Sequence, residues 1–200
     1  MTIRPVRVLL GSLGLSFALS AAPALAAKPC VGASLPITGP TAWAADSIRM
    51  GVEVAMAEIN AKGGVLGQRL NFVAYDDAGQ PPRGVDNARR IAESDDCIAM
   101  FGGWHSGVAL AVVEPVHDAL IPYIAVISAG TKITENDRKP NYMFRVSMFD
   151  RWQALALVRK SKEVTKTGNI GVLYEDTGWG QGAVPDLKAS ASAENAKVVG

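Results

Sequence analysis

The chain has 200 residues, and its 20 basic and 19 acidic side chains give a formal net charge of +1. This balance provides no basic field that would attract nucleic acid. With 48% hydrophobic and 6% aromatic residues, the composition is normal for a globular α/β protein of ordinary domain size.

The N-terminal segment has the layout of a secretory signal peptide. Arg4 and Arg7 precede an apolar stretch at residues 8–19, and an Ala-Leu-Ala cleavage site follows at residues 24–26. A retained membrane anchor is the alternative, because an uncharged run of 20 residues could just span a bilayer. Cleavage near Ala26 is favoured by the cleavage site itself and by the residues that dilute the apolar run, which are Gly11, Gly14, Ser16, Ser20 and Pro23. We therefore expect a soluble exported protein.

Short apolar runs alternate with helical periodicity along the next part of the chain. Strands are predicted at residues 31–35, 70–75, 97–101 and 123–127. Helices are predicted between them, with apolar periodicity at residues 48–59, 85–92 and 108–120. This βαβαβαβ series requires a doubly wound, mostly parallel sheet with right-handed crossovers. Its common strand order is 2-1-3-4, in which the loops after strands one and three meet at the topological switch point, where ligands bind.

The alternation changes after the fourth predicted strand. A polar stretch at residues 134–141 interrupts it. A second series of helix, strand and helix is then predicted at residues 150–165, 169–174 and 183–194. We interpret residues 27–146 as a first α/β lobe and residues 147–200 as the beginning of a second, similar lobe that is expected to be incomplete.

Three motifs resemble catalytic, metal or nucleotide sites. His105-Ser106 places a base beside a nucleophile, but sequence neighbours rarely face each other productively, and the G-x-S-x-G elbow is absent. His117 has no nearby set of Cys, His or Asp with metal-ligand spacing. The loop at residues 178–182 lacks the third glycine of a dinucleotide fingerprint. We expect no enzyme activity, no metal and no cofactor, and an exported hydrolase that uses Ser106 is the less favoured alternative.

The two cysteines open neighbouring strands of the predicted sheet. Cys30 begins the first strand and Cys97 the third, so both are expected at one edge of the sheet, with Cα atoms roughly 5 to 6 Å apart. An oxidising compartment favours a disulfide over the alternative of two free buried thiols.

Polar and aromatic residues gather where the first, third and fourth predicted strands end. Trp43 is expected on the first loop and Ser106 on the second, and residues 128–131, which begin with Ser128, follow the fourth strand. Hydroxyls, backbone amides and an aromatic side chain thus converge, which predicts the capture of a small molecule. The alternative is that Ser106 only caps its helix and Trp43 only packs.

A set of motifs that is specific in combination extends from residue 30 to the end of the chain. They are Leu35-Pro36-Ile37-Thr38-Gly39-Pro40, Ala57-Glu58-Ile59-Asn60, Gly63-Gly64-Val65-Leu66-Gly67, Tyr75-Asp76-Asp77, Ser106-Gly107-Val108, Phe144-Arg145 and residues 174–182. Together they resemble the periplasmic substrate-binding proteins of branched-chain amino acid ABC transporters. The resemblance implies the type I periplasmic binding protein fold, in which two α/β lobes close around an amino acid.

The resemblance also implies roles for individual residues. Ser106 and the loop with Ala129 and Thr131 would hold the α-carboxylate of the ligand. Trp43 would form an aromatic wall, and Trp179, where tyrosine is usual, would face the ligand from the second lobe. The acid that pairs with the amino group is expected in sequence beyond this chain.

The implied partners are a small ligand, an amino acid or related carboxylate, and the membrane permease of an ABC transporter. No nucleic-acid partner is expected. An extracellular ligand-sensing domain of the same fold is the closest alternative function.

Overall fold

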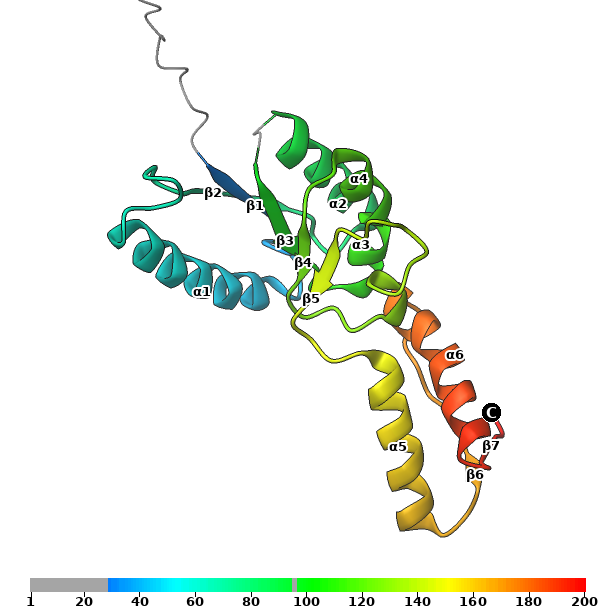
Figure 1. Cartoon of the computed structure of the whole chain (residues 1–200). Coiled ribbons are helices and arrows are strands. Elements are labelled where there is room, and N and C mark those ends of the chain that lie inside the picture. The colour runs from blue at the N-terminus through cyan, green and yellow to red at the C-terminus, as the bar shows by residue number, and fades with distance from the viewer. Residues whose placement is uncertain (1–28, 95–96) are drawn as a thin grey trace, which may run out of the picture.

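Five parallel strands form the central sheet of the protein (Figure 1). The computed structural model describes residues 29–94 and 97–200. The signal peptide expected at residues 1–26 lies outside this part of the chain. Within the described ranges, no helix combines the length and the apolar character needed to cross a membrane. The strands of the sheet are β1 (Cys30–Leu35), β2 (Asn71–Asp76), β3 (Ala99–Gly102), β4 (Tyr123–Ala125) and β5 (Met143–Arg145).

The strand order confirms the predicted doubly wound topology. The sheet has the order β2-β1-β3-β4-β5, and each neighbouring pair is parallel. The order 2-1-3-4 was expected, and β5, which follows the polar stretch, extends the sheet at its edge. All five strands therefore direct their carboxyl ends toward the same edge.

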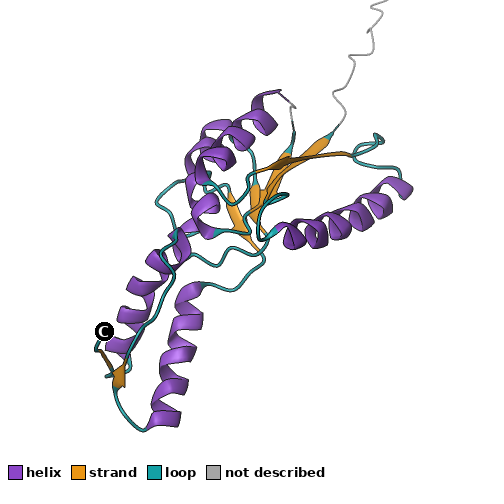
Figure 2. Cartoon of the chain, turned by 180° about the vertical axis from the view of Figure 1, so that it is seen from behind, coloured by secondary structure: helices purple, strands orange, loops and turns teal. Residues whose placement is uncertain are grey.

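Helices cover both faces of the sheet (Figure 2). The main cluster joins Met100 and Tyr123 to apolar residues of the helices on one face, and a smaller cluster joins Leu35 and Phe101 to the helix on the other face. Met100 and Phe101 lie in different clusters because successive side chains of a strand point to opposite faces. The smaller cluster faces α1 (Ala42–Ala61), and the main one faces α2 (Pro81–Arg89) with its π-helical extension η1 (Arg90–Ser94), α3 (Ser106–Ala111) and α4 (Val113–Ala119).

The third predicted helix is divided into α3 and α4, so its continuity was predicted wrongly. Pro115 lies in the first turn of α4. A proline ring clashes with the carbonyl of the residue four positions earlier and removes its hydrogen bond. That carbonyl belongs to Ala111, the last residue of α3. Pro115 therefore explains where the helix is interrupted.

Two long helices extend away from the sheet (Figure 1). They pack against each other, and a short parallel pair of strands joins their far ends. The second of these helices begins at Gly178, earlier than the predicted residue 183. The Thr177 hydroxyl accepts a hydrogen bond from the Gly180 N–H and caps the helix, so the glycine-rich residues form its first turn. The assignment of residues 147–200 to a second lobe stays a prediction. The elements are α5 (Asp150–Thr165), β6 (Asn169–Ile170), α6 (Gly178–Ala193) and β7 (Lys197–Val198).

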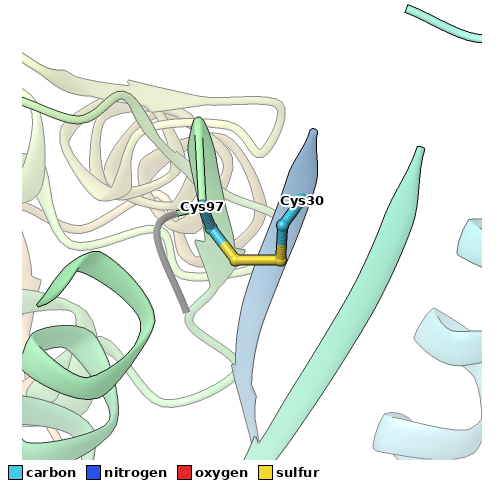
Figure 3. The surroundings of a disulfide bond; sticks show 2 residues. All are labelled: Cys30 and Cys97. Carbon is cyan, nitrogen blue, oxygen red and sulfur yellow. A yellow bond between two sulfur atoms is a disulfide. The ribbon is translucent and has the colours of Figure 1, made fainter. Parts of the chain in front are cut away.

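A disulfide joins Cys30 to Cys97 (Figure 3). Their Cα atoms are 4.3 Å apart, closer than the separation expected from the sequence. Beside the bond, the N–H of Ile98 donates to the carbonyl of Cys30 at 2.9 Å. The disulfide thus links the beginning of β1 to the segment that enters β3.

The buried carboxyl group of Asp77 lies at the carboxyl ends of β1 and β2. Asp77 is 1% exposed, and its Oδ2 accepts a hydrogen bond from the Ser34 hydroxyl at 2.9 Å. Its Oδ1 accepts the N–H of Gly79 at 2.8 Å and so shapes the loop that follows β2. Burial raises the pKa of Asp77 and outweighs these hydrogen bonds, which act in the opposite direction.

The double substitution Cys30→Ser with Cys97→Ser should lower the free energy of unfolding by about 4 kcal/mol, because the bond closes a long loop in the unfolded chain. Urea unfolding of the oxidised protein and of the variant measures this difference. Dithiothreitol should destabilise the wild type and leave the variant unchanged. Equal unfolding midpoints of the oxidised wild type and the variant would contradict the prediction.

Asp77→Asn should become more stable relative to the wild type as the pH rises from about 4 to 7. The raised pKa means that the folded wild type holds this proton more tightly than the unfolded chain, so its contribution is present at low pH and is lost as the pH rises through the folded pKa. Urea unfolding at several pH values measures the difference. A difference between Asp77→Asn and the wild type that stays constant with pH would refute the prediction.

Candidate ligand-binding site

A cleft of about 750 Å³ lies at the carboxyl ends of the parallel strands. The loops of the sheet form one side, and α5 with the start of α6 forms the other. The two sides meet at Gly107 and Gly178. Their backbones lie so close that a Cβ added to Gly178 would be only 2.7 Å from the Cα of Gly107. The lining residues are Thr41, Gly79, Pro81, Trp104, His105, Ser106, Gly107, Ile127, Ser128, Ala129, Gln153, Glu175, Thr177, Gly178 and Trp179.

Ser106 lines this cleft and is 3% exposed. It is the first residue of α3, whereas His105 occupies the N-cap position. The Ser106 hydroxyl accepts the N–H of Gly130 at 3.4 Å. The Ser106 hydroxyl thus connects α3 to the loop after β4.

Side-chain hydrogen bonds from Ser128 and Arg145 hold the loop after β4. The Ser128 hydroxyl donates to the carbonyl of Gly103. The Arg145 guanidinium donates to the carbonyls of Ala129 at 2.8 Å and of Gly130 at 2.6 Å. The carbonyls of Ala129 and Gly130 are therefore paired within the protein. The N–H groups of Ser128 and Gly130 are paired as well, with the Gly103 carbonyl and the Ser106 hydroxyl. Sequence reasoning assigned no role to Arg145, although the Phe144-Arg145 motif marked its position.

Thr131 begins the short 3-10 helix η2 (Thr131–Ile133), which follows this loop, and does not line the cleft. Its hydroxyl donates to Oδ2 of Asp186 in α6 at 2.6 Å and accepts the N–H of Arg151 at 3.3 Å. The hydroxyl is thus engaged with the two long helices. A direct contact between Thr131 and a ligand stays a prediction.

Trp43 lies in the first turn of α1 and is 62% exposed, so its placement on a loop was wrong. Its ring makes an edge-to-face contact with Trp104, with 4.9 Å between the ring centroids. Trp104 lines the cleft, whereas Trp43 does not. The aromatic side chain that lines this side of the cleft is therefore Trp104, which Trp43 contacts. The bulk of Trp104 in a glycine-rich loop was the signal that could have identified it.

Trp179 lines the opposite side of the cleft from the first turn of α6. Its indole N–H donates to Oδ1 of Asp150 at 3.0 Å. Of the predicted site residues, the structure thus brings Ser106, Ser128, Ala129 and Trp179 to one cleft.

Both histidines have hydrogen-bond partners in the described part of the chain. Nε2 of His105 lies 3.2 Å from the Thr41 hydroxyl, and no hydrogen bond joins this ring to Ser106. His117 is buried, with one ring nitrogen on a backbone carbonyl of its own helix and the other accepting the N–H of Tyr142. No group of three or more acidic, cysteine or histidine side chains in the described ranges could hold a metal ion.

Comparisons with known proteins find relatives with a common architecture. A Leu/Ile/Val-binding protein homolog of Brucella abortus is 30% identical over 158 residues, which cover 79% of this chain and 42% of that protein. An ABC transporter substrate-binding protein of Desulfitobacterium hafniense, solved with Leu, superposes with a TM-score of 0.69 at 22% identity and covers 86% of this chain and 49% of its own. A solute-binding protein of R. palustris, solved with 4-hydroxybenzoate, gives 0.73 at 23% identity, with coverages of 86% and 45%.

The chain spans less than half the length of these relatives. The family model that describes periplasmic binding proteins matches residues 30–200, which include the sheet, the cleft and both long helices. The chain therefore belongs to the periplasmic binding protein family.

Proposed function

We propose that the chain is the ligand-capturing part of an exported solute-binding protein that delivers a small carboxylate, such as a branched-chain amino acid, to an ABC transporter permease. The observation that carries this proposal is the cleft at the strand ends, which combines polar donors with two indole rings. Among the described residues that line it there is no lysine or arginine. Capture by hydrogen bonds and apolar contact is the chemistry that this lining supports.

The carboxylate end of the ligand is assigned to Ser106 and the loop around Ala129. The first amides of α3 have no partner within their own helix, as in every helix, and they lie beside the Ser106 hydroxyl. Hydrogen bonds from such donors to a carboxylate are charge-assisted and are about twice as strong as neutral ones. Arg145 donates to the carbonyls of Ala129 and Gly130, and Ser128 donates to the carbonyl of Gly103. These hydrogen bonds preorganise the loop.

The apolar end of the ligand is assigned to the space between Trp104 and Trp179. The relatives named for leucine, isoleucine and valine, and the structures solved with Leu and with 4-hydroxybenzoate, share a ligand chemistry of one carboxylate on a compact apolar body. Indole rings on both sides of the cleft are suited to such a body. An aromatic acid is therefore the second ligand to test.

The proposed compartment is the periplasm, with a signal peptide that is cleaved near Ala26. A disulfide such as Cys30–Cys97 persists in an oxidising environment, which supports this location. We also propose that residues 147–200 begin a second lobe, which closes over the cleft when ligand binds.

Ser106→Ala in the full-length protein should weaken the binding of L-leucine by about 1 to 3 kcal/mol, because a buried hydrogen bond to the carboxylate is lost. Isothermal titration calorimetry measures the affinities, first for L-leucine, L-isoleucine and L-valine and then for 4-hydroxybenzoate.

Ser161→Ala in α5, at a position outside the cleft lining, is the matched control and should leave the affinity unchanged. Equal affinities of the wild type and Ser106→Ala would show that Ser106 only supports the loop. Absence of binding to all four compounds by the wild type would reject the proposed ligand class.

A further inference from the structure

Asp150 contacts both sides of the cleft although it does not line it. It is the first residue of α5, where the chain leaves the sheet, and is 3% exposed. Its backbone N–H donates to the carbonyl of Ala129 at 2.9 Å. Its Oδ1 accepts the indole N–H of Trp179 at 3.0 Å and the side-chain amide of Gln153 at 3.4 Å. One buried residue thus touches three cleft-lining residues, from the β4 loop, α5 and α6.

We infer that Asp150 is a positioning residue of the proposed binding site, whose carboxylate fixes the indole of Trp179 in the wall of the cleft. This inference rests on the proposed function. Trp179 is 43% exposed, so packing alone holds only part of its ring. The hydrogen bond to Asp150 sets the direction of the indole N–H and thereby the face that the ring presents to a ligand.

The surroundings of Asp150 argue against a role in stability alone. Burial raises the pKa of Asp150, and the Trp179 hydrogen bond and the nearby Arg145 charge oppose this only in part. Oδ2 is buried and has no hydrogen-bond partner among the described residues. Burial of an incompletely paired carboxyl group costs free energy, and an apolar side chain would pack at lower cost. An apolar side chain could not accept the indole N–H.

A second connection, between η2 and α6, does not involve Asp150. Thr131 donates to Asp186 of α6, so the two sides of the cleft stay connected when the Asp150 side chain is changed. Substitution of Asp150 therefore isolates the orientation of Trp179 from the general packing of the helices.

The first experiment observes Trp179 directly by ¹⁹F NMR of the full-length protein labelled with 5-fluorotryptophan. Trp179→Phe assigns the resonance. Asp150→Ala removes the acceptor and should shift and broaden the Trp179 line, whereas the lines of Trp43 and Trp104 should stay in place. Asp150→Asn keeps an acceptor oxygen and should leave the Trp179 line close to its wild-type position. Should Asp150→Ala fail to fold, Asp150→Leu, which fills the space without an acceptor, replaces it.

The second experiment measures L-leucine and 4-hydroxybenzoate binding by calorimetry. Asp150→Ala and Trp179→Phe should each weaken binding by about fivefold or more, and the double variant should bind no more weakly than the weaker single variant, because both act through one hydrogen bond. Asp150→Asn should bind within about twofold of the wild type. Asp118→Asn, on the surface of α4, is the matched control and should bind as the wild type does.

An unmoved Trp179 line in Asp150→Ala, or effects of Asp150→Ala and Trp179→Phe that multiply in the double variant, would overturn the inference. If the wild type binds neither compound, the proposed ligand class fails, while the ¹⁹F spectra still decide whether Asp150 positions Trp179.

Discussion

Parallel pairing of β1 with β2 on one side and β3 on the other is the constraint on which the site depends. Parallel strands direct their carboxyl ends to one edge, so the loops after β1, β3 and β4 meet there without further requirement. The disulfide joins Cys30, at the amino end of β1, to Cys97, just before β3. It therefore links the two strands at the ends that lie away from the cleft. The cleft is thus a consequence of sheet topology, and the loop residues give it its chemistry.

The loop after β4 is preorganised by hydrogen bonds to its carbonyls. A loop of irregular backbone exposes both donors and acceptors, but a carboxylate can use only donors. Arg145 pairs two carbonyls of the β4 loop, and its guanidinium stacks on the Phe149 ring at 4.2 Å, which restricts its movement. Ser128 pairs the carbonyl of Gly103. The free energy of ordering these groups is therefore spent on folding rather than on binding.

The sequence predicted the sheet order, the closeness of the cysteines and the position of Ser106 and Ser128 at the cleft. Each followed from the alternation of predicted strands and helices, combined with the common strand order of doubly wound sheets. The same reasoning placed Trp43 on a loop, because apolar periodicity begins only at Ile48 and does not mark the first turn of α1. It also treated the third helix as continuous, although Pro115 was visible in the sequence.

The sequence by itself determined which strands are neighbours and which loops share an edge, since both follow from the local alternation of strands and helices and from the common strand order of doubly wound sheets. Only the tertiary structure decided that Trp104 rather than Trp43 lines the cleft, that Thr131 pairs with Asp186 and that Trp179 pairs with Asp150. The partners in these two hydrogen bonds lie 55 and 29 residues apart in the chain. No local period encodes such pairs, because the distance between the two side chains depends on how α5 and α6 pack against the loops of the sheet.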